Sequence, residues 1–133
     1  MFEYLKSIGH AFDGLVHAFL TERNLRLFGW FYVISLMLGV ILHISIAEWA
    51  IVIFSGGIFL AVELVNTALE HFTDAFDTHS KGIHYNAIKA TKDIAAAASL
   101  VCGVAWGLML CFLFVPHIWE WWLAQWDGNT SGM

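Results

Sequence analysis

The sequence predicts an all-α integral membrane protein with three transmembrane helices and an N-terminal amphipathic surface helix. Of its 133 residues, 59% are hydrophobic and only 13% are charged, and the mean hydropathy is +0.71. A soluble globule of this length needs more charged residues to cover its surface. Long runs without charge, each sufficient to cross a bilayer, support the same class. We expect one membrane domain over residues 1–133.

The pattern of residues 1–22 indicates an amphipathic helix and not a secretory signal. The segment lacks a long apolar run and carries Glu3, Lys6 and Asp13. Its apolar residues recur at steps of three and four, at Phe2, Leu5, Ile8, Phe12, Leu15, Val16 and Phe19. We therefore expect this helix to lie in the membrane interface, with its polar face toward water.

Three further stretches predict the transmembrane helices. Residues 27–47 hold no charge over 21 positions, which at about 1.5 Å per residue crosses a hydrocarbon core of about 30 Å. The short polar patch from His43 to Glu48 can supply only a tight turn, so the second span covers 49–69, with Glu63 as its sole charge. The third span is 94–119, and it ends in an aromatic belt of tryptophans. Residues 127–133 predict a mobile polar tail.

The basic residues predict the orientation in the membrane. All six lie in the N-terminal segment or in the second connection, between 70 and 93: Lys6, Arg23, Arg26, Lys81, Lys89 and Lys92. Because basic loops stay on the cytoplasmic side, both regions are expected to face the cytoplasm. The connection itself is expected to be helical at both ends. No nucleic acid is expected as a partner, since six basic residues form no dense patch.

Polar side chains follow one stripe of the second span and its continuation. They are spaced at i, i+3, i+7 and i+11, at Glu63, Asn66, Glu70 and Asp74. A charge at the centre of a spanning helix costs about 2.5 to 3.5 kcal/mol on insertion scales. Glu63 is therefore protonated, paired inside a bundle, or functional. The structural alternatives are a polar lock between helices for Glu63 and an interhelical hydrogen bond for Asn66.

The chemistry of this stripe leaves several functions open. The sequence contains no Walker A motif, kinase glycine-rich loop, nucleophile elbow or H-E-x-x-H motif. What remains is a set of carboxylates with Lys92 and Asp93 nearby, and such oxygen ligands favour Mg²⁺, which commonly arrives on nucleotide phosphates. A phosphotransferase, a small proton or cation transporter subunit, and a structural assembly protein all stay possible at this point.

Two motifs carry a specific resemblance. The run E-L-V-N-T-A-L-E-x-x-x-D spans Glu63 to Asp74, and A-T-K-D-I-A-A-A-A spans Ala90 to Ala98. Together they resemble the signature of the small prokaryotic diacylglycerol kinase and undecaprenol kinase family, over nearly the whole chain. The T-E-R-N stretch at 21–24 and the E-L-x-N-T-A motif resemble the undecaprenol kinase branch more than the classical diacylglycerol kinase branch.

This resemblance implies a homotrimer of three-helix protomers in the bacterial cytoplasmic membrane, with active sites shared between neighbouring subunits at the cytoplasmic face. The implied reaction is ATP-dependent phosphorylation of the primary hydroxyl of a membrane lipid alcohol. Undecaprenol is the favoured substrate, and diacylglycerol is the alternative. Mg²⁺ is the implied cofactor.

The resemblance also implies roles for individual residues. Glu63 matches the catalytic general base. Glu22 and Glu70 match the pair that holds the metal of Mg-ATP and so belong to the nucleotide site. The other matching nucleotide-binding positions are His10, Asn66, Asp74, Tyr85, Lys92 and Asp93.

The chain departs from the family pattern at two places. Family members usually carry a His eight residues before the aspartate of the Lys-Asp pair, whereas Tyr85 stands there and His84 stands one residue earlier. Glu3 also occupies a region that often supplies a basic contact to nucleotide. That contact is therefore absent or comes from Lys6.

Overall fold

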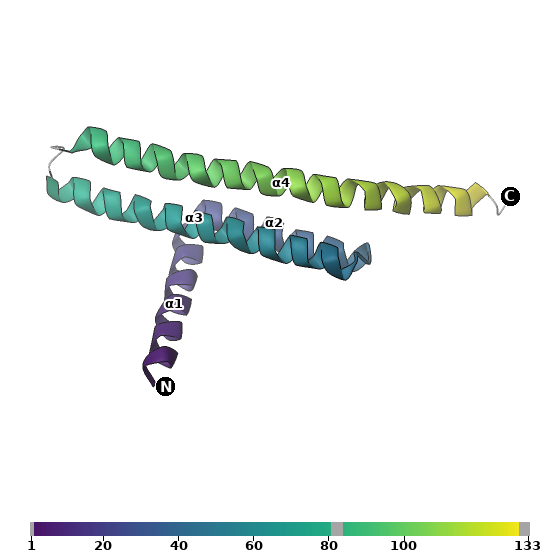
Figure 1. The fold of residues 1–133 in the computed structure, drawn as a ribbon, viewed down its shortest axis with the longest axis horizontal. Coiled ribbons are helices and arrows are strands. Elements are labelled where there is room, and N and C mark those ends of the chain that lie inside the picture. Colours follow the sequence, from purple (N-terminus) through teal and green to yellow (C-terminus); the bar gives the residue numbers. More distant parts are fainter. Residues whose placement is uncertain (1, 81–83, 131–133) are drawn as a thin grey trace.

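A computed structural model describes residues 2–80 and 84–130, and every regular element in this part of the chain is an α-helix. The helices are α1 (Phe2–Thr21), α2 (Arg23–Ile41), α3 (Ile46–Ser80) and α4 (Tyr85–Thr130). Figure 1 shows α2, α3 and α4 running alongside one another, while α1 projects away from them at a steep angle.

Helices α2, α3 and α4 are each long and apolar enough to cross a membrane. The qualifying segments are Arg23–Ile41, Ile46–Thr78 and Tyr85–Trp126. The prediction of an all-helical protein with three candidate spans is therefore confirmed.

Helices α3 and α4 are longer than the predicted spans. Helix α2 is not, because it ends at Ile41 and the chain turns at 42–45, where His43 has a positive φ of 51°, so the predicted end of the first span at 47 is wrong. Helix α3 continues beyond Leu69 to Ser80, and α4 begins at Tyr85, well before the predicted start at 94. The residues in these extensions include no Gly or Pro, so nothing in them interrupts a helix. The polar stripe of the second span therefore continues on one unbroken helix.

The far end of α4 also differs from the prediction. The helix continues past Pro116 to Thr130, so residues 127–130 are helical and do not belong to a tail. Residues 131–133 lie outside the described part of the chain. With 46 residues, α4 is about 69 Å long at 1.5 Å per residue, and Figure 1 shows it extending beyond the turn between α2 and α3.

The α2–α3 turn, residues 42–45, is closed by reciprocal hydrogen bonds. The Ser45 backbone N–H donates to Glu48 Oε2 over 2.7 Å, and the Glu48 N–H donates to Ser45 Oγ over 3.3 Å. This capping box satisfies backbone groups at the start of α3. Beside it, Ile44, Val52 and Phe114 form a buried cluster that fixes α4 against the turn.

Close packing in the middle of the bundle depends on glycine. A Cβ atom added at Gly56 would lie 2.4 Å from the ring of Tyr32, and one at Gly103 would lie 3.0 Å from the ring of Phe59. Phe59 is almost fully buried and stacks on Trp106 with ring centroids 5.2 Å apart. The contacts of Phe59 with Gly103 and Trp106 set the rotation of α4 relative to α3, and the contact of Gly56 with Tyr32 brings α2 close to α3.

Helix α1 is attached to the bundle by its C-terminal end. The Arg26 guanidinium donates hydrogen bonds to the backbone carbonyls of Phe19 and Leu20, at 3.2 and 2.7 Å. Such carbonyls at a helix end have no partner within the helix, so a cation from α2 satisfies them. Farther toward the N-terminus, Ile8 and Phe12 are exposed.

Candidate functional site

The predicted site residues lie mainly on the halves of α3 and α4 that meet at the α3–α4 connection. Glu63, Asn66, Glu70 and Asp74 come from α3, and Lys92 comes from α4. The α1–α2 junction adds Glu22, the N-cap residue of α2, whose backbone is extended and so separates the two helices.

Glu63 is a buried carboxylate, with only 4% of its surface exposed. Ser99 Oγ of α4 donates a hydrogen bond to Glu63 Oε2. Ser99 was not predicted as a site residue, and it is itself 8% exposed. The only sequence signal for Ser99 was a single hydroxyl at the end of the alanine run 95–98. From the sequence alone, this small-residue run indicates only close helix packing.

Asn66 lies one turn from Glu63 and is bonded to the next acid of the stripe. Its Nδ2 donates to Glu70 Oε1 over 2.9 Å. The opposite atom, Asn66 Oδ1, is buried and has no hydrogen-bond partner among the described residues. An unpaired buried acceptor costs about 1 to 3 kcal/mol. A donor from a ligand or a neighbouring subunit would recover this free energy.

Glu22 reaches α3 at the position next to Glu70. Glu22 Oε1 and His71 Nε2 are 2.9 Å apart, and the ring of His17 lies edge-on to His71 with a centroid separation of 6.4 Å. The two predicted metal ligands thus lie on neighbouring parts of the structure. His71 was not singled out from the sequence, because its spacing matches no metal-binding motif.

Asp74 and Lys92 join α3 to α4 nearer the connection. Lys92 Nζ donates to Asp74 Oδ1 over 2.5 Å. The Asp74 side chain is 65% exposed, so this pair faces solvent. It places an ammonium group close to the predicted nucleotide side of the site.

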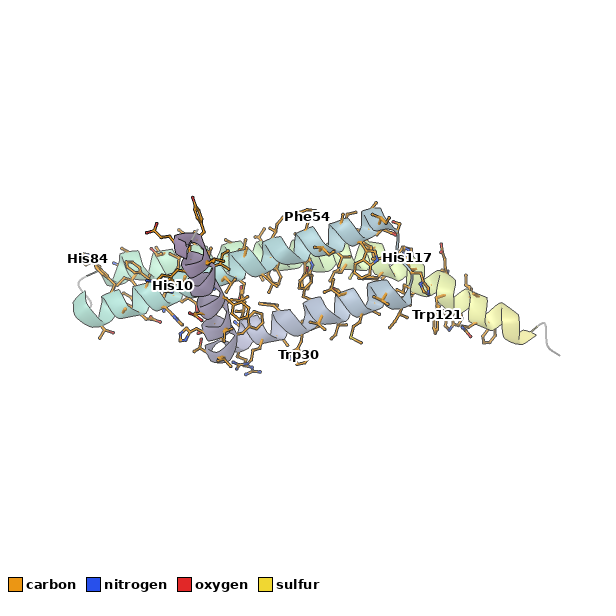
Figure 2. The ribbon with its side chains drawn as sticks, turned by 90° about the horizontal axis from the view of Figure 1, so that it is seen from below. His10, Trp30, Phe54, His84, His117 and Trp121 are labelled. Atoms are coloured by element: carbon orange, nitrogen blue, oxygen red, sulfur yellow. The ribbon has the colours of Figure 1, made fainter. Side chains whose placement is uncertain are left out.

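Three predicted residues are not gathered with the others. His10, Tyr85 and Asp93 are exposed, and within the described ranges they make no hydrogen bond or ion pair with the other predicted site residues. Figure 2 shows His10 on α1 and His84 at the α3–α4 connection. The His84 ring lies against Phe76, with centroids 5.8 Å apart.

Comparison with known proteins decides between the candidate functions. Residues 9–114 match the model of the prokaryotic diacylglycerol kinase family. The chain belongs to this family. It is 32% identical over 115 residues to the undecaprenol kinase of Bacillus subtilis (strain 168), covering 86% of this chain and 90% of that protein. It is 31% identical over 114 residues to the diacylglycerol kinase of Synechocystis sp. (strain ATCC 27184 / PCC 6803 / Kazusa), covering 86% of this chain and 63% of that protein.

The resemblance inferred from the two motifs is confirmed, and the chain is a lipid kinase. The family match ends at residue 114. The tryptophan-bearing end of α4 therefore lies outside the part that the family model describes.

The donor set of this lipid kinase fits a magnesium ion carried by nucleotide. Within residues 2–80 and 84–130, no group of three or more His, Cys, Asp or Glu side chains could hold a metal by itself. Glu22 and Glu70 each use one oxygen in the contacts above, and a second carboxylate oxygen remains on each. Mg²⁺ commonly takes one or two protein carboxylates and completes its shell with phosphate and water. The same set does not fit a four-ligand zinc site.

Proposed function

We propose that this lipid kinase transfers the γ-phosphoryl group of ATP to the primary hydroxyl of a membrane lipid alcohol, with undecaprenol as the favoured substrate. The observation that carries the proposal is the buried carboxylate of Glu63 in a candidate spanning helix, one turn from Asn66 and two turns from Glu70. Undecaprenol is favoured because the relative named for that substrate is matched over most of its length. Diacylglycerol is the alternative substrate.

In this proposal Glu63 is the general base. The substrate hydroxyl donates its proton to the Glu63 carboxylate while its oxygen attacks the γ-phosphorus. The bond between that phosphorus and the β–γ bridging oxygen breaks, and ADP leaves with that oxygen. The products are the lipid phosphate, ADP and a protonated Glu63, which later returns its proton to solvent.

The polar residues closer to the α3–α4 connection bind the nucleotide. Glu22 and Glu70 would hold Mg²⁺, which when bound offsets the negative charge of the phosphates. Asn66 and Lys92 orient the phosphate groups, and Asp74 holds the Lys92 ammonium in place.

A homotrimer completes the site. His10, Tyr85 and Asp93 are exposed in a single protomer, so a neighbouring subunit is needed to bring them to nucleotide bound at Glu22 and Glu70. The unpaired Asn66 Oδ1 supports the same assembly, because a ligand or partner must supply its donor.

The apolar part of the substrate lies in a groove beside Glu63. A cavity of about 360 Å³ opens between α2 and α4. Its lining includes Phe28, Phe31, Ser99, Leu100 and Trp106. Ser99 links this groove directly to the Glu63 carboxylate. A lipid chain in the groove would hold its terminal hydroxyl at that carboxylate.

The proposed orientation puts the α3–α4 connection and the N-terminus in the cytoplasm of a bacterial cell, with α1 on the inner membrane surface. The segregation of all six basic residues supports it. In a variant lacking Cys102 and Cys111, a cysteine introduced at position 80 should react with a membrane-impermeant thiol reagent only after the cells are opened. Labelling of intact cells would overturn the orientation.

A panel of lipid alcohols tests the function. Purified protein in defined bilayers receives ATP labelled at the γ-phosphate, Mg²⁺, and undecaprenol, diacylglycerol or no added alcohol. We expect label in a chloroform-extractable product only when an alcohol is present, with the higher kcat/KM for undecaprenol. Absence of a labelled lipid with every alcohol, in protein shown to bind ATP, would contradict lipid phosphorylation. Proton or cation flux in the same vesicles would instead support a transporter.

A further inference from the structure

We propose that Ser99 is a positioning residue for Glu63, an inference that rests on the proposed role of Glu63 as the base. The hydroxyl of Ser99 on α4 donates to Oε2 of Glu63 on α3, and both side chains are buried. The two residues are 36 positions apart in the chain. The contact therefore depends on how α3 and α4 are docked.

Other hydroxyls in these helices make a different bond. Ser55 Oγ donates to the backbone carbonyl of Ile51 over 2.6 Å, and Thr91 Oγ1 donates to that of Ala87 over 3.0 Å. This bond to a carbonyl four residues earlier is the usual choice for a hydroxyl within a helix. Ser99 instead donates to a carboxylate on another helix. The difference points to a role beyond satisfying its own hydroxyl.

The surroundings make this hydroxyl hard to replace. Ser99 is the only hydroxyl-bearing residue from Ile94 to Phe114, and four alanines precede it. The adjoining groove is lined by aromatic and aliphatic side chains. Loss of the Ser99 hydroxyl would leave Glu63 Oε2 facing apolar groups, and a buried acceptor without a donor is costly.

The hydrogen bond also explains how one carboxylate oxygen is presented to the substrate. The terminal torsion of a glutamate side chain is broad, so the carboxylate plane is not fixed by rotamer preference alone. With Oε2 held by Ser99, the plane is set and Oε1 is left to accept the proton of the lipid hydroxyl. A base must lie within hydrogen-bond reach of the proton it takes, so this orientation affects turnover.

Three substitutions at position 99 separate the hydroxyl from side-chain size. Ser99→Thr keeps the hydroxyl, Ser99→Val has the same shape as Thr without it, and Ser99→Ala removes it without added bulk. We expect Ala and Val to lower kcat for the lipid alcohol about 10-fold, with KM for Mg-ATP within about twofold of the wild type. Thr should restore kcat to near the wild-type value. Ser55→Ala is the matched control, because it removes a hydroxyl that bonds within its own helix, and it should leave kcat unchanged.

The outcomes also separate this inference from the proposed function. In a Glu63→Gln background, Ser99→Ala should cause no further loss of kcat, because the two residues act as one unit. If Glu63→Gln is inactive while Ser99→Ala and Ser99→Val turn over like the wild type, the positioning role is wrong and the base assignment stands. Equal losses in Thr and Val, with lowered thermal stability in both, would also overturn the positioning role in favour of packing. If Glu63→Gln itself turns over normally, the base assignment fails and the positioning role fails with it.

Discussion

Each half of α3 contributes one residue to a contact between a glutamate and a histidine, but the surroundings of the two contacts differ. At the N-terminal end, Glu48 and Ser45 of the turn are joined by two hydrogen bonds. The Oε1 atom of Glu48 lies 3.4 Å from Nε2 of His117 on α4. Its partners close the start of α3 and hold α4 beside the buried cluster at Ile44. The polar groups at this end satisfy one another.

At the other end, the polar contacts are incomplete. Glu22 meets His71, and Asn66 meets Glu70, yet each carboxylate keeps an oxygen outside these bonds. Asn66 Oδ1 is buried without a partner in the described part of the protein. Because stability favours closed polar networks, we propose that a ligand or a neighbouring subunit completes the contacts at this end. In the proposed function, the chemistry lies at this end of α3 and the N-terminal end is structural.

The largest change in turnover is expected from substitution of Glu63. Glu63→Gln keeps the size of the side chain but removes its basicity, so kcat should fall about 10² to 10⁴-fold with little change in nucleotide affinity. The measurement is turnover of undecaprenol by purified protein with the same oligomeric state as the wild type, with nucleotide binding measured separately. If the variant phosphorylates undecaprenol at nearly the wild-type rate, Glu63 is not the base, and its carboxyl group would instead be a polar lock between helices.

A smaller effect is expected for the two predicted metal ligands. Glu22→Gln or Glu70→Gln should raise the Mg²⁺ concentration needed for half-maximal activity by about 10-fold, since each removes one charged oxygen ligand. The oligomeric state should match that of the wild type. Glu120→Gln, an exposed acid at the opposite end of α4, is the matched control and should leave the Mg²⁺ dependence unchanged. Unaltered Mg²⁺ titrations in both site variants would remove these acids from the metal site.

The smallest effect on activity is expected at the closed end. Glu48→Gln weakens the capping box and the contact with His117, so the thermal unfolding midpoint should fall slightly. Turnover and Mg²⁺ dependence should match those of the wild type below that midpoint. A fall in kcat without a fall in stability would show that the two ends of α3 are coupled and that the division drawn here is too simple.

Much of the fold could be predicted from the sequence because each of the three spans is a long apolar run. The boundaries of the helices could not be predicted in the same way. Glu70 and the charges that follow it mark the end of an apolar run, but they are compatible with helix, so α3 continues to Ser80. The same reasoning fails at Pro116, which α4 accommodates within the helix.

The arrangement of the predicted residues along α3 could be derived from the sequence, but their contacts across the helices could not. Helical periodicity places Glu63, Asn66 and Glu70 on one stripe, as the structure has them. It does not give the rotation of α4 against α3, which follows from contacts such as Gly103 against Phe59. Ser99 was missed for that reason. The roles assigned to all the site residues, including His10, Tyr85 and Asp93, stay predictions.

The turn at residues 42–45 also has a consequence for biogenesis. In the proposed orientation this turn must be carried across the membrane as the protein is inserted, and it contains no charged residue. The short link joins α2 and α3 into a helical hairpin in which the helical backbone groups bond within the pair itself, as a membrane requires. The basic residues stay behind on the side where synthesis occurs. Insertion of the first two spans therefore requires the transfer of little more than one tight turn.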